Sequence, residues 1–453
     1  MKAMGIDIGT TTACGILLDT DSGAVVDVRT LANDSVIEGK PFEWLQDPER
    51  IWELVQQMYT EFTGKYSDIG CIGLTGQMHG ILYTDSEGRS VSPLYTWQDE
   101  RGNEKMEDGK TYAEYLSEQT GYAMATGFGI TTHYYNMKHG LVPEGAVSMC
   151  TIQDYMGMKL TGRKRPLLSS SDGASLGCFD REKLCFDMEA IEKLGIEPSI
   201  IPECEGGFTL IGRTPEGIPV GAGIGDNQAS VIGSVRELKD SVLVNVGTAN
   251  QISVGIDKYI DTRRIDIRPL AGTQYICAGA GLCGGRAYAA LERFFRQVVE
   301  TMTGQKTEVL YGKMGELLEK RGMKPGTLTV DTRFCGTREN PQLTGSINHL
   351  TLDNFKPEEF IYGVLGGIVE ELATFHKVML ELGAPKPKYL IGSGNAVRMN
   401  KYLQAVFEAE FGMKMQIPVH NEEAAYGAAL YAMTASGICP SLADAQKRIS
   451  YLS

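Results

Sequence analysis

The sequence predicts an α/β protein made of two related domains, each of about 220 residues. A strand–turn–strand pattern at residues 6–19 returns at residues 244–257, so that Gly9 corresponds to Gly247, 238 positions later. Apolar strands in both halves also run into glycine-rich turns and then into amphipathic helices, which is the order found in α/β domains. With 453 residues, 42% of them hydrophobic, the chain can bury a large core in each half.

Each copy of the repeat has the pattern of a β-hairpin whose tip carries glycine and hydroxyl residues. The first tip contains Gly9, Thr10 and Thr11, and the second contains Gly247 and Thr248. Backbone N–H groups and threonine hydroxyls at a tight turn can hold phosphate oxygens. The two tips therefore suggest a polyphosphate clamped between two domains; the alternative is a pair of ordinary hairpins that match by chance.

The first half continues with a helix and a buried strand. Asp47 and Pro48 begin the helix, and its apolar side chains recur at helical spacing as far as residue 62. Residues 69–74 are predicted to be a buried strand, and a short apolar stretch at residues 81–83 leads to a turn at 86–88.

The end of the first half carries two polar or glycine-rich segments. Residues 169–173, rich in serine, are predicted to be a polar loop. Residues 218–226 are predicted to be a short strand that enters a glycine-rich turn, and we place the domain boundary there. The predicted domains are residues 1–222 and 223–453.

The second half repeats the hairpin and then alternates turns with helices. A glycine turn at residues 281–285 precedes a helix, residues 361–382 form a long helix, and a strand at 389–391 leads into a turn at 392–395. Such strand–turn–helix units present backbone N–H groups to a nucleotide in many α/β domains. A last strand at 415–419 precedes a helix of small residues at 424–429.

Two aspartates stand where strands end. Asp7 precedes the first turn, where a carboxylate can hold Mg²⁺ through its waters; the alternative is a carboxylate that caps local N–H groups. The repeat has Asn245 in its place. Asp226 lies where a glycine-rich strand becomes a helix, at the domain junction, so it is a candidate general base. Asp is also a good helix N-cap, and the local sequence does not decide between these two roles.

A polar and aromatic set occupies residues 77–101. Aromatic faces cover the C–H faces of a polyhydroxylated ligand, while carboxylates and amides take its hydroxyls. The alternative is an exposed turn anchored by a tryptophan. The candidate residues are Gln77, His79, Trp97, Asp99 and Arg101.

Composition excludes several classes of protein. A net charge of −14, a pI near 5.1 and the lack of any Lys/Arg run longer than residues 163–165 argue against nucleic-acid binding. Ten cysteines without a C-x-x-C pair are typical of core thiols in a reducing compartment. No signal-peptide pattern or apolar run of ~18–20 residues is found. We expect a cytoplasmic protein with no membrane partner, and we leave its oligomeric state open, with a homodimer as one option.

The ordered set of motifs resembles the FGGY family of carbohydrate kinases, within the actin, Hsp70 and hexokinase superfold. The matching segments lie at residues 5–11, 76–80, 97–101, 225–227, 245–248, 334–338 and 392–400. The resemblance implies two ribonuclease H-like domains with ATP and a sugar in the cleft between them. It implies transfer of the ATP γ-phosphoryl group to the terminal hydroxyl of a ketose. Gln98 is more like sedoheptulokinases and Asn227 more like xylulokinases, so sedoheptulose is the first expectation and another pentulose or polyol the alternative.

The resemblance also assigns roles to residues. Asp226 would be the general base and Asp7 the residue beside Mg²⁺. The sugar would contact Gln77, Met78, His79, Trp97, Asp99, Arg101 and Asn227. The nucleotide would contact Gly9, Thr10, Thr11, Gly247, Thr248, Gly281, Gly284, Gly285, Gly392, Ser393, Gly394, Asn395 and Asn400.

Two other classes of protein remain as alternatives. An actin- or Hsp70-like ATPase would use the same clamp to drive protein binding, but it gives no reason for the set formed by Trp97, Asp99 and Arg101. A non-catalytic sugar sensor would share the fold, but the presence of Asp7, Thr10, Thr248 and Asp226 argues against it.

Overall fold

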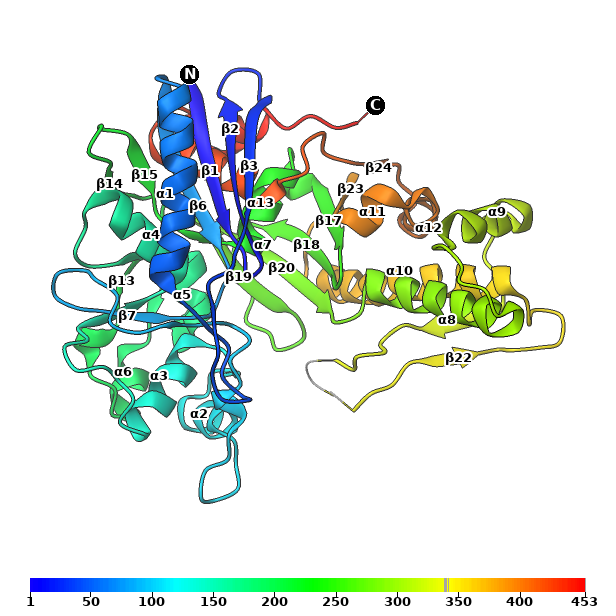
Figure 1. Ribbon diagram of the computed structural model, residues 1–453, viewed down its shortest axis with the longest axis horizontal. Coiled ribbons are helices and arrows are strands. Elements are labelled where there is room, and N and C mark those ends of the chain that lie inside the picture. The colour runs from blue at the N-terminus through cyan, green and yellow to red at the C-terminus, as the bar shows by residue number, and fades with distance from the viewer. Residues whose placement is uncertain (338–339, 341, 453) are drawn as a thin grey trace.

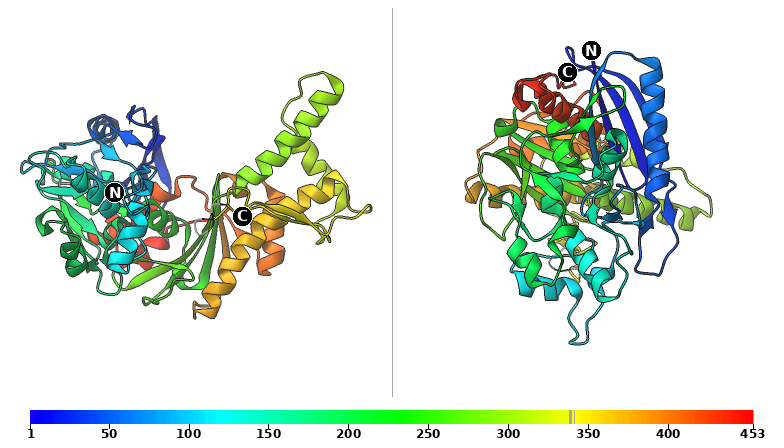
Figure 2. Two further views of the ribbon diagram at one scale, coloured as in Figure 1. Left: turned by 90° about the horizontal axis from the view of Figure 1, so that it is seen from below. Right: turned by 90° about the vertical axis from the view of Figure 1, so that its left-hand side faces the viewer.

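Two lobes, each built on a central β-sheet, make up the computed structural model, which describes residues 1–337, 340 and 342–452 (Figure 1). The first lobe contains the N-terminus and the second contains the long helix α10 (Pro357–Glu381). In the left view of Figure 2, helices α8 (Gly285–Thr303) and α9 (Tyr311–Arg321) project away from the body of the second lobe. Arg338, part of one of the matching segments, lies outside the described residues.

The first sheet is built around the N-terminal hairpin. Its order is β14–β15–β6–β1–β2–β3, and β16 also pairs with β6. β1, β2 and β3 run antiparallel, whereas β6 lies parallel to β1. The strands are β1 (Lys2–Ile8), β2 (Thr12–Asp19), β3 (Val25–Ala32), β6 (Ile69–Gly76), β14 (Leu210–Arg213), β15 (Pro219–Gly221) and β16 (Ile224–Gly225).

The second sheet repeats this arrangement, which confirms the predicted internal repeat. Its order is β19–β20–β18–β17–β23–β24. The antiparallel pair β17 and β18 corresponds to β1 and β2, and β23 lies parallel to β17 as β6 does to β1. The strands are β17 (Ser241–Val246), β18 (Asn250–Ile256), β19 (Asp266–Ala271), β20 (Gln274–Gly281), β23 (Tyr389–Ser393) and β24 (Met415–Gln416).

The two hairpins differ by one residue at their tips. In the first, Ile8 pairs with Ala13 and the Gly9 N–H donates to the Thr12 carbonyl at 2.9 Å. In the second, Val246 pairs with Asn250 and the Gly247 N–H donates to the Ala249 carbonyl at 3.0 Å. The second turn is one residue shorter, so the 238-residue offset holds up to Thr248 and is lost in the strand that follows.

Two helices pack against each other between the sheets. The first, α7 (Asp226–Ser234), carries Asp226, and α13 (Glu423–Ala435) also packs on β6 and β1. A side chain at Gly427 would meet the Ala229 carbonyl oxygen at 1.8 Å, so only glycine allows this approach. Helix α13 comes from beyond residue 222 yet covers the first sheet, and the domain boundary at residues 222–223 stays a prediction.

The predicted loop at residues 169–173 is wrong. Residue 169 ends strand β10 (Leu167–Ser169), and the segment continues as helix α5 (Ser170–Leu176), in which every residue is buried. Its hydroxyls bond to backbone elsewhere: Ser169 Oγ donates to the Gly223 carbonyl at 2.6 Å, and Ser171 Oγ accepts from the Gly225 N–H at 2.9 Å. These polar side chains are therefore buried, and they hold the segment at residues 223–225 instead of facing water.

Two of the predicted helices are confirmed. The predicted helix at residues 48–62 is α1 (Pro48–Lys65), capped by Asp47, and the predicted helix at 361–382 corresponds to α10, which begins earlier and ends at Glu381. Among the described residues, none of the helices combines the length and apolarity needed to cross a bilayer. The remaining elements are β4 (Val36–Ile37), β5 (Leu45–Gln46), β7 (Leu82–Thr84), β8 (Leu94–Tyr95), α2 (Tyr112–Thr120), α3 (Gly129–Lys138), β9 (Ser148–Cys150), α4 (Ile152–Thr161), β11 (Phe179–Asp180), β12 (Cys185–Phe186), α6 (Met188–Lys193), β13 (Glu203–Glu205), β21 (Thr329–Asp331), β22 (Ser346–Asn348), α11 (Asn395–Met399), α12 (Lys401–Phe411) and α14 (Leu442–Gln446).

Candidate active site

Asp226 is the first residue of α7, immediately after β16. The N-cap position belongs to Gly225, and no side chain caps this helix. The Asp226 side chain is exposed, and its Oδ1 accepts only the neighbouring Asn227 N–H, at 2.6 Å. The structure therefore does not support the helix-cap interpretation, and it leaves the carboxylate open to a ligand.

Carboxyl groups gather around Asp226. Although the Asp226 side chain reaches solvent, the surrounding protein partly removes water from its carboxylate and so raises its pKa, while the Asn227 N–H and the positive charge of Arg268 oppose that rise. Burial, followed by the negative charges of Asp226 and Glu422, raises the pKa of Asp7 to about 7. Burial also raises the pKa of Asp172, to which Asp226 contributes repulsion. Asp226 thus lies between a carboxyl from β1 and another from α5.

The donor set around Asp7 fits a bound divalent cation. Asp7 is half-buried at the end of β1 and close enough to Asp226 and Glu422 for their charges to act on it. A cation would relieve that repulsion and lower the pKa of Asp7. Among the described residues, no group of three or more His, Cys, Asp or Glu side chains is arranged to hold a metal by itself. A magnesium ion here would therefore need water or phosphate oxygens as further ligands.

A hydrogen-bonded network joins the first turn to the polar–aromatic segment. Trp97 Nε1 donates to Thr10 Oγ1 at 3.1 Å, and Thr10 Oγ1 lies 3.4 Å from Gln77 Oε1. Gln46 completes the network, accepting from Gln77 Nε2 at 2.7 Å and donating to the Thr10 carbonyl at 2.8 Å. Trp97 keeps 47% of its surface exposed. The structure thus brings together the tip of the first hairpin and two of the predicted sugar contacts.

His79 is held in an unusual backbone conformation. Its φ of 73° is a left-handed value that non-glycine residues rarely adopt. Its Nδ1 lies 2.7 Å from the Ser175 carbonyl, its N–H donates to Ser175 Oγ at 3.2 Å, and its ring stacks on Phe128. Helix α5 therefore positions both His79 and the Gly223–Gly225 approach to Asp226. The neighbouring Met78 is buried against Gly225.

Asp99 and Arg101 form a buried ion pair. Arg101 Nε and Nη2 donate to the two Asp99 oxygens at 2.5 and 3.1 Å, and Asp99 also accepts the Trp44 N–H at 3.2 Å. Their exposed fractions are 0% and 1%. In this conformation both side chains support the segment that carries Trp97, and their predicted direct contact with a sugar stays a prediction. Asn227, by contrast, is partly exposed next to Asp226.

The second turn is held against the start of α8. The Gly284 N–H donates to the Thr248 carbonyl at 3.1 Å, and the Gly285 N–H to the Gly247 carbonyl at 2.9 Å. Thr248 itself is exposed. Gly281, at the end of β20, lies against the side chains of Asn250 and Glu371. The N–H groups of Gly284 and Gly285 are therefore used inside the protein, while the Thr248 side chain is exposed.

The turn after β23 lies beside the second hairpin. Val244 pairs with Gly392 and Asn245 with Ser393, so this turn ends at the level of the hairpin tip. Gly394 has a φ of 82°, and a side chain there would meet the Val246 carbonyl oxygen at 2.7 Å. Asn395 is exposed.

Asn400 caps the helix that follows this turn. Its Oδ1 accepts the N–H groups of Tyr402 and Leu403 at 3.0 and 3.1 Å, so it is the N-cap of α12. Its predicted contact with the nucleotide stays a prediction.

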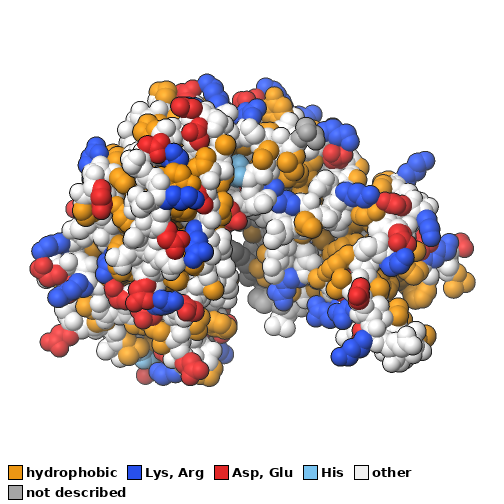
Figure 3. All heavy atoms as spheres, turned by 45° about the horizontal axis from the view of Figure 1, so that its top comes forward, with side chains coloured by type: hydrophobic (Ala, Val, Ile, Leu, Met, Phe, Trp, Pro, Cys, Tyr) orange, Lys and Arg blue, Asp and Glu red, His pale blue; other side chains and the backbone are white. Residues whose placement is uncertain are grey.

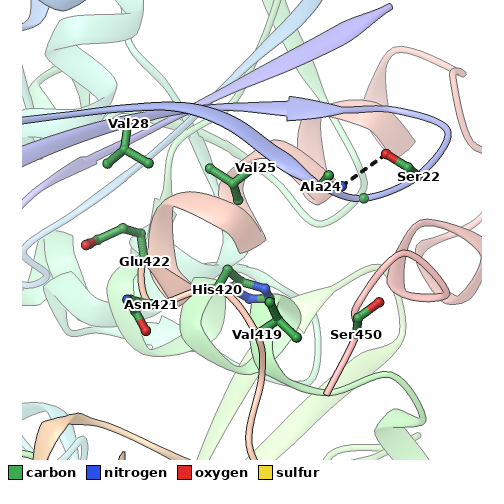
Figure 4. A pocket seen from close by; sticks show the side chains of 10 residues that line it. Ser22, Ala24, Val25, Val28, Val419, His420, Asn421, Glu422 and Ser450 are labelled. Atoms are coloured by element: carbon green, nitrogen blue, oxygen red, sulfur yellow. Dashed lines mark hydrogen bonds between the residues drawn. The ribbon is translucent and has the colours of Figure 1, made fainter. Parts of the chain in front are cut away.

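Two pockets lie outside the predicted site. One of about 560 Å³ is bordered by residues 22–28, residues 419–422 and Ser450 (Figure 4). Glu422 lines it, but its carboxylate points away from Ser22 and Ser450 in that view. The other, about 510 Å³, lies between residues 121–182 of the first lobe and residues 259–263 of the second. Many of the predicted site residues instead lie at or just after the ends of β1, β6, β16, β17, β20 and β23, and Figure 3 shows the molecule hollowed between the lobes.

Sequence reasoning missed several residues of this region. Gln46 and the serines of α5 carry no motif, and the serines were assigned to a loop. Arg268 donates to Asn227 Oδ1 at 3.0 Å from a strand that contributed no candidate. Glu422 acts on Asp7 from the start of α13. Only the contrast between a charged Arg268 and the apolar residues around it, in 265–271, could have marked it.

Comparison with known proteins places these features in a family. Residues 2–233 match the model of the N-terminal domain of the FGGY family of carbohydrate kinases. The sedoheptulokinase of Mus musculus is 27% identical over 94% of this chain and 96% of its own length. The xylulose kinase of Streptomyces coelicolor is 23% identical over 95% and 87%. The crystal structure of xylulose kinase from Rhodospirillum rubrum superposes with a TM-score of 0.85 at 19% identity, over 100% of this chain and 93% of that one.

Proposed function

The chain belongs to the FGGY family of carbohydrate kinases, and we propose that its acceptor is sedoheptulose, phosphorylated on the terminal hydroxyl. As an ATP-dependent sugar kinase it transfers a phosphoryl group from ATP to a sugar. The observation that carries the assignment of a base is Asp226, uncapped and exposed at the first position of α7, among the carboxyl ends of the central strands.

We assign the proton transfer to Asp226. Its carboxylate accepts the proton of the attacking hydroxyl, and that oxygen forms the new bond to the γ-phosphorus as the bond to the leaving ADP oxygen breaks. The transition state is loose, so positioning and charge stabilisation supply most of the rate. Magnesium, when bound beside Asp7, would neutralise charge on the phosphates. Because the pKa values of Asp7 and Asp172 are raised, a cation bound beside Asp7 would favour the ionised form of its carboxyl group.

The nucleotide would lie on the second lobe. The exposed Thr248 hydroxyl and the Gly394 turn, where backbone comes close to Val246, offer donors at the level of the strand ends. Thr10 would approach the phosphates from the first lobe, with its hydroxyl oriented by Trp97. The nucleotide contacts predicted from the sequence are proposed on the same basis, including those of Gly281, Gly392 and Asn395.

The sugar would lie on the first lobe. The exposed Trp97 face, His79 fixed by Ser175, and the Asn227 amide surround the approach to Asp226. A site built to hydrogen-bond hydroxyls rejects analogues that leave its polar groups unpaired. The relatives named sedoheptulokinase align over nearly the whole chain, which supports a seven-carbon ketose as the acceptor.

An acceptor screen tests this proposal. ADP release would be measured with ATP and Mg²⁺ against sedoheptulose, xylulose, ribulose, fructose and glycerol. We expect the highest kcat/KM with sedoheptulose. A preference for xylulose would indicate the acceptor of the xylulose kinases among the relatives and would contradict sedoheptulose as the acceptor. ATP turnover that no sugar increases would contradict the proposal as a whole. The cytoplasmic location and the homodimer remain predictions from the sequence.

A further inference from the structure

One charged chain crosses from the first lobe to the second beside Asp226. Arg181, in the turn between β11 and β12, donates through Nη1 to Asp266 Oδ1 at 2.7 Å and to the Ile267 carbonyl at 2.9 Å. Asp266 Oδ2 accepts from Arg268 Nε at 2.7 Å, and Arg268 Nη1 donates to Asn227 Oδ1 at 3.0 Å. The chain therefore ends on the residue next to the proposed base.

We propose that Arg268 is a positioning residue for phosphoryl transfer, which from β19 fixes the Asn227 amide and places a positive charge beside Asp226. This inference rests on the proposed roles of Asp226 and Asn227. The Asp266 carboxylate and Arg181 hold the guanidinium in place from the other side.

The contact with Arg268 determines what Asn227 offers to a ligand. A guanidinium has only donors, so the Asn227 atom that faces it must be the amide oxygen. The Asn227 Nδ2 group has no hydrogen-bond partner within the described part of the chain. The amide hydrogens are thus left for an acceptor, such as a sugar hydroxyl oxygen next to the reacting one.

The start of α7 is bound to β19 at a second point. Gln228, which follows Asn227, donates through Nε2 to the carbonyl of Pro269, which follows Arg268, at 3.2 Å. Only 13% of the Arg268 side chain is exposed, so its bonds are shielded from competing water. Movement of β19 would therefore move the first turn of α7 and the base with it.

Arg268 supplies positive charge next to Asp226, where the neighbouring side chains are carboxyl groups. Asp7 faces Asp226 from β1 and Asp172 faces it from α5, and both are carboxyl groups. Arg268 is the cation that lowers the pKa of Asp226 among the described residues. Removing it should raise that pKa, so a base that must be ionised would lose activity first at low pH.

Arg268→Met and Arg268→Lys test the inference, with Arg264→Met as the matched control. Arg264 is close in sequence, but its side chain is 54% exposed and pairs with Glu381 at the surface. Each variant would be assayed for kcat, both KM values, the pH profile of kcat/KM for the sugar, and Tm. We expect Arg268→Met to lower kcat/KM for the sugar by ~10–100-fold, the size of one charge-assisted hydrogen bond, with the KM for ATP unchanged. The acid limb of its pH profile of kcat/KM should move to higher pH. Arg268→Lys should keep that limb near its original position, and Arg264→Met should change none of the measured quantities.

The outcomes separate this inference from the proposed function. A folded Arg268→Met enzyme with normal kinetics and pH profile would overturn it. Equal losses of kcat/KM in both Arg268 variants, with a lowered Tm and an unmoved acid limb, would show that Arg268 only stabilises the fold. That result would also overturn the inference. Asp226→Asn is measured in parallel: if that variant turns over normally, the assignment of the base fails, whereas an inactive Asp226→Asn beside normal Arg268 variants refutes only the role of Arg268. If Arg268→Met does not fold, Arg268→Gln takes its place, because it keeps a donor for Asn227 and removes the charge; an acid limb at higher pH than in Arg264→Met is expected, and an unmoved limb would overturn the inference.

Discussion

Replacing Asp99 with alanine should destabilise the first lobe by about 3–5 kcal/mol, because it removes the hydrogen-bonded counter-charge of the buried Arg101 guanidinium and leaves only Glu43, at 3.8 Å, beside it. Arg101 is 1% exposed and gives two side-chain hydrogen bonds to Asp99. Its guanidinium also lies 4.2 Å from the centre of the Tyr95 ring, so it cannot turn towards water without opening the core. The Trp44 N–H would lose its acceptor as well.

Calorimetry measures this effect, and an exposed pair of the same chemistry is the control. For a lobe of about 200 residues, 1 kcal/mol corresponds to roughly 2–4 °C, so Asp99→Ala should lower Tm by roughly 6–20 °C. Arg50 binds Asp34 with the same forked geometry, at 2.8 and 3.1 Å, but these side chains are 39% and 61% exposed. Asp34→Ala should therefore change the Tm far less than Asp99→Ala does. Equal shifts for the two variants would refute the reasoning.

The same Asp99 variant also tests sugar binding. Because the pair supports the segment that carries Trp97, the KM for the sugar should rise far more than the KM for ATP. Asp99→Ala protein that remains folded at the assay temperature would be compared with the parent under saturating concentrations of the other substrate. Equal increases in both KM values would place the Trp97 segment away from the sugar.

Three further predictions address packing, pH and the nucleotide. Gly427→Ala should destabilise the protein by about 3 kcal/mol, since its side chain would meet the Ala229 carbonyl. Gly366→Ala, with nothing within 4 Å of the added side chain, should instead stabilise α10 by about 0.5–1 kcal/mol. Denaturant unfolding that ranks the two variants the other way would contradict the close contact between α7 and α13. Burial raises the pKa of Asp172 from 3.8 to about 7, so between these two pH values the unfolded chain releases a proton that the folded protein keeps, and stability falls as the pH rises. The Tm of Asp172→Asn minus that of the parent should grow from about pH 4 to about pH 7 and then level off, and a constant difference would argue against it. Thr248→Val should raise the KM for ATP by roughly 3–10-fold and leave that for the sugar unchanged, and steady-state kinetics with no change in the KM for ATP would remove Thr248 from the nucleotide site.

Much of the fold could be predicted because its signals are local. The two hairpins, α1 with its Asp47 cap and the long apolar face of α10 each depend on residues close together in the chain. The one-residue difference between the hairpin tips was not visible, because a shortened turn leaves the apolar pattern of both strands intact. Helix α5 was missed because its serines find backbone partners about 54 positions away, at Gly223 and Gly225.

The candidate site shows the same division. Asp226, Thr10 and Thr248 were predicted because each follows a strand end, where an α/β fold exposes its residues. Asp99 and Arg101 have the residue types of a sugar site, yet these types also pair with each other when a fold encloses them. Arg268 had only a weak signal in the sequence, a charge within a mostly apolar segment, because its partner Asn227 lies on another element 41 positions away.

The central claim is that Asp226 acts as the base for phosphoryl transfer, and the most direct test is the kcat of Asp226→Asn. Gly225 caps α7, so asparagine at position 226 keeps the side-chain size and the start of the helix while removing the proton acceptor. With sedoheptulose and ATP saturating, we predict that kcat falls by roughly 10²–10⁴ while Tm and the affinities for ATP and sugar stay close to those of the parent. A folded Asp226→Asn enzyme that releases ADP at near the parental rate would contradict the account.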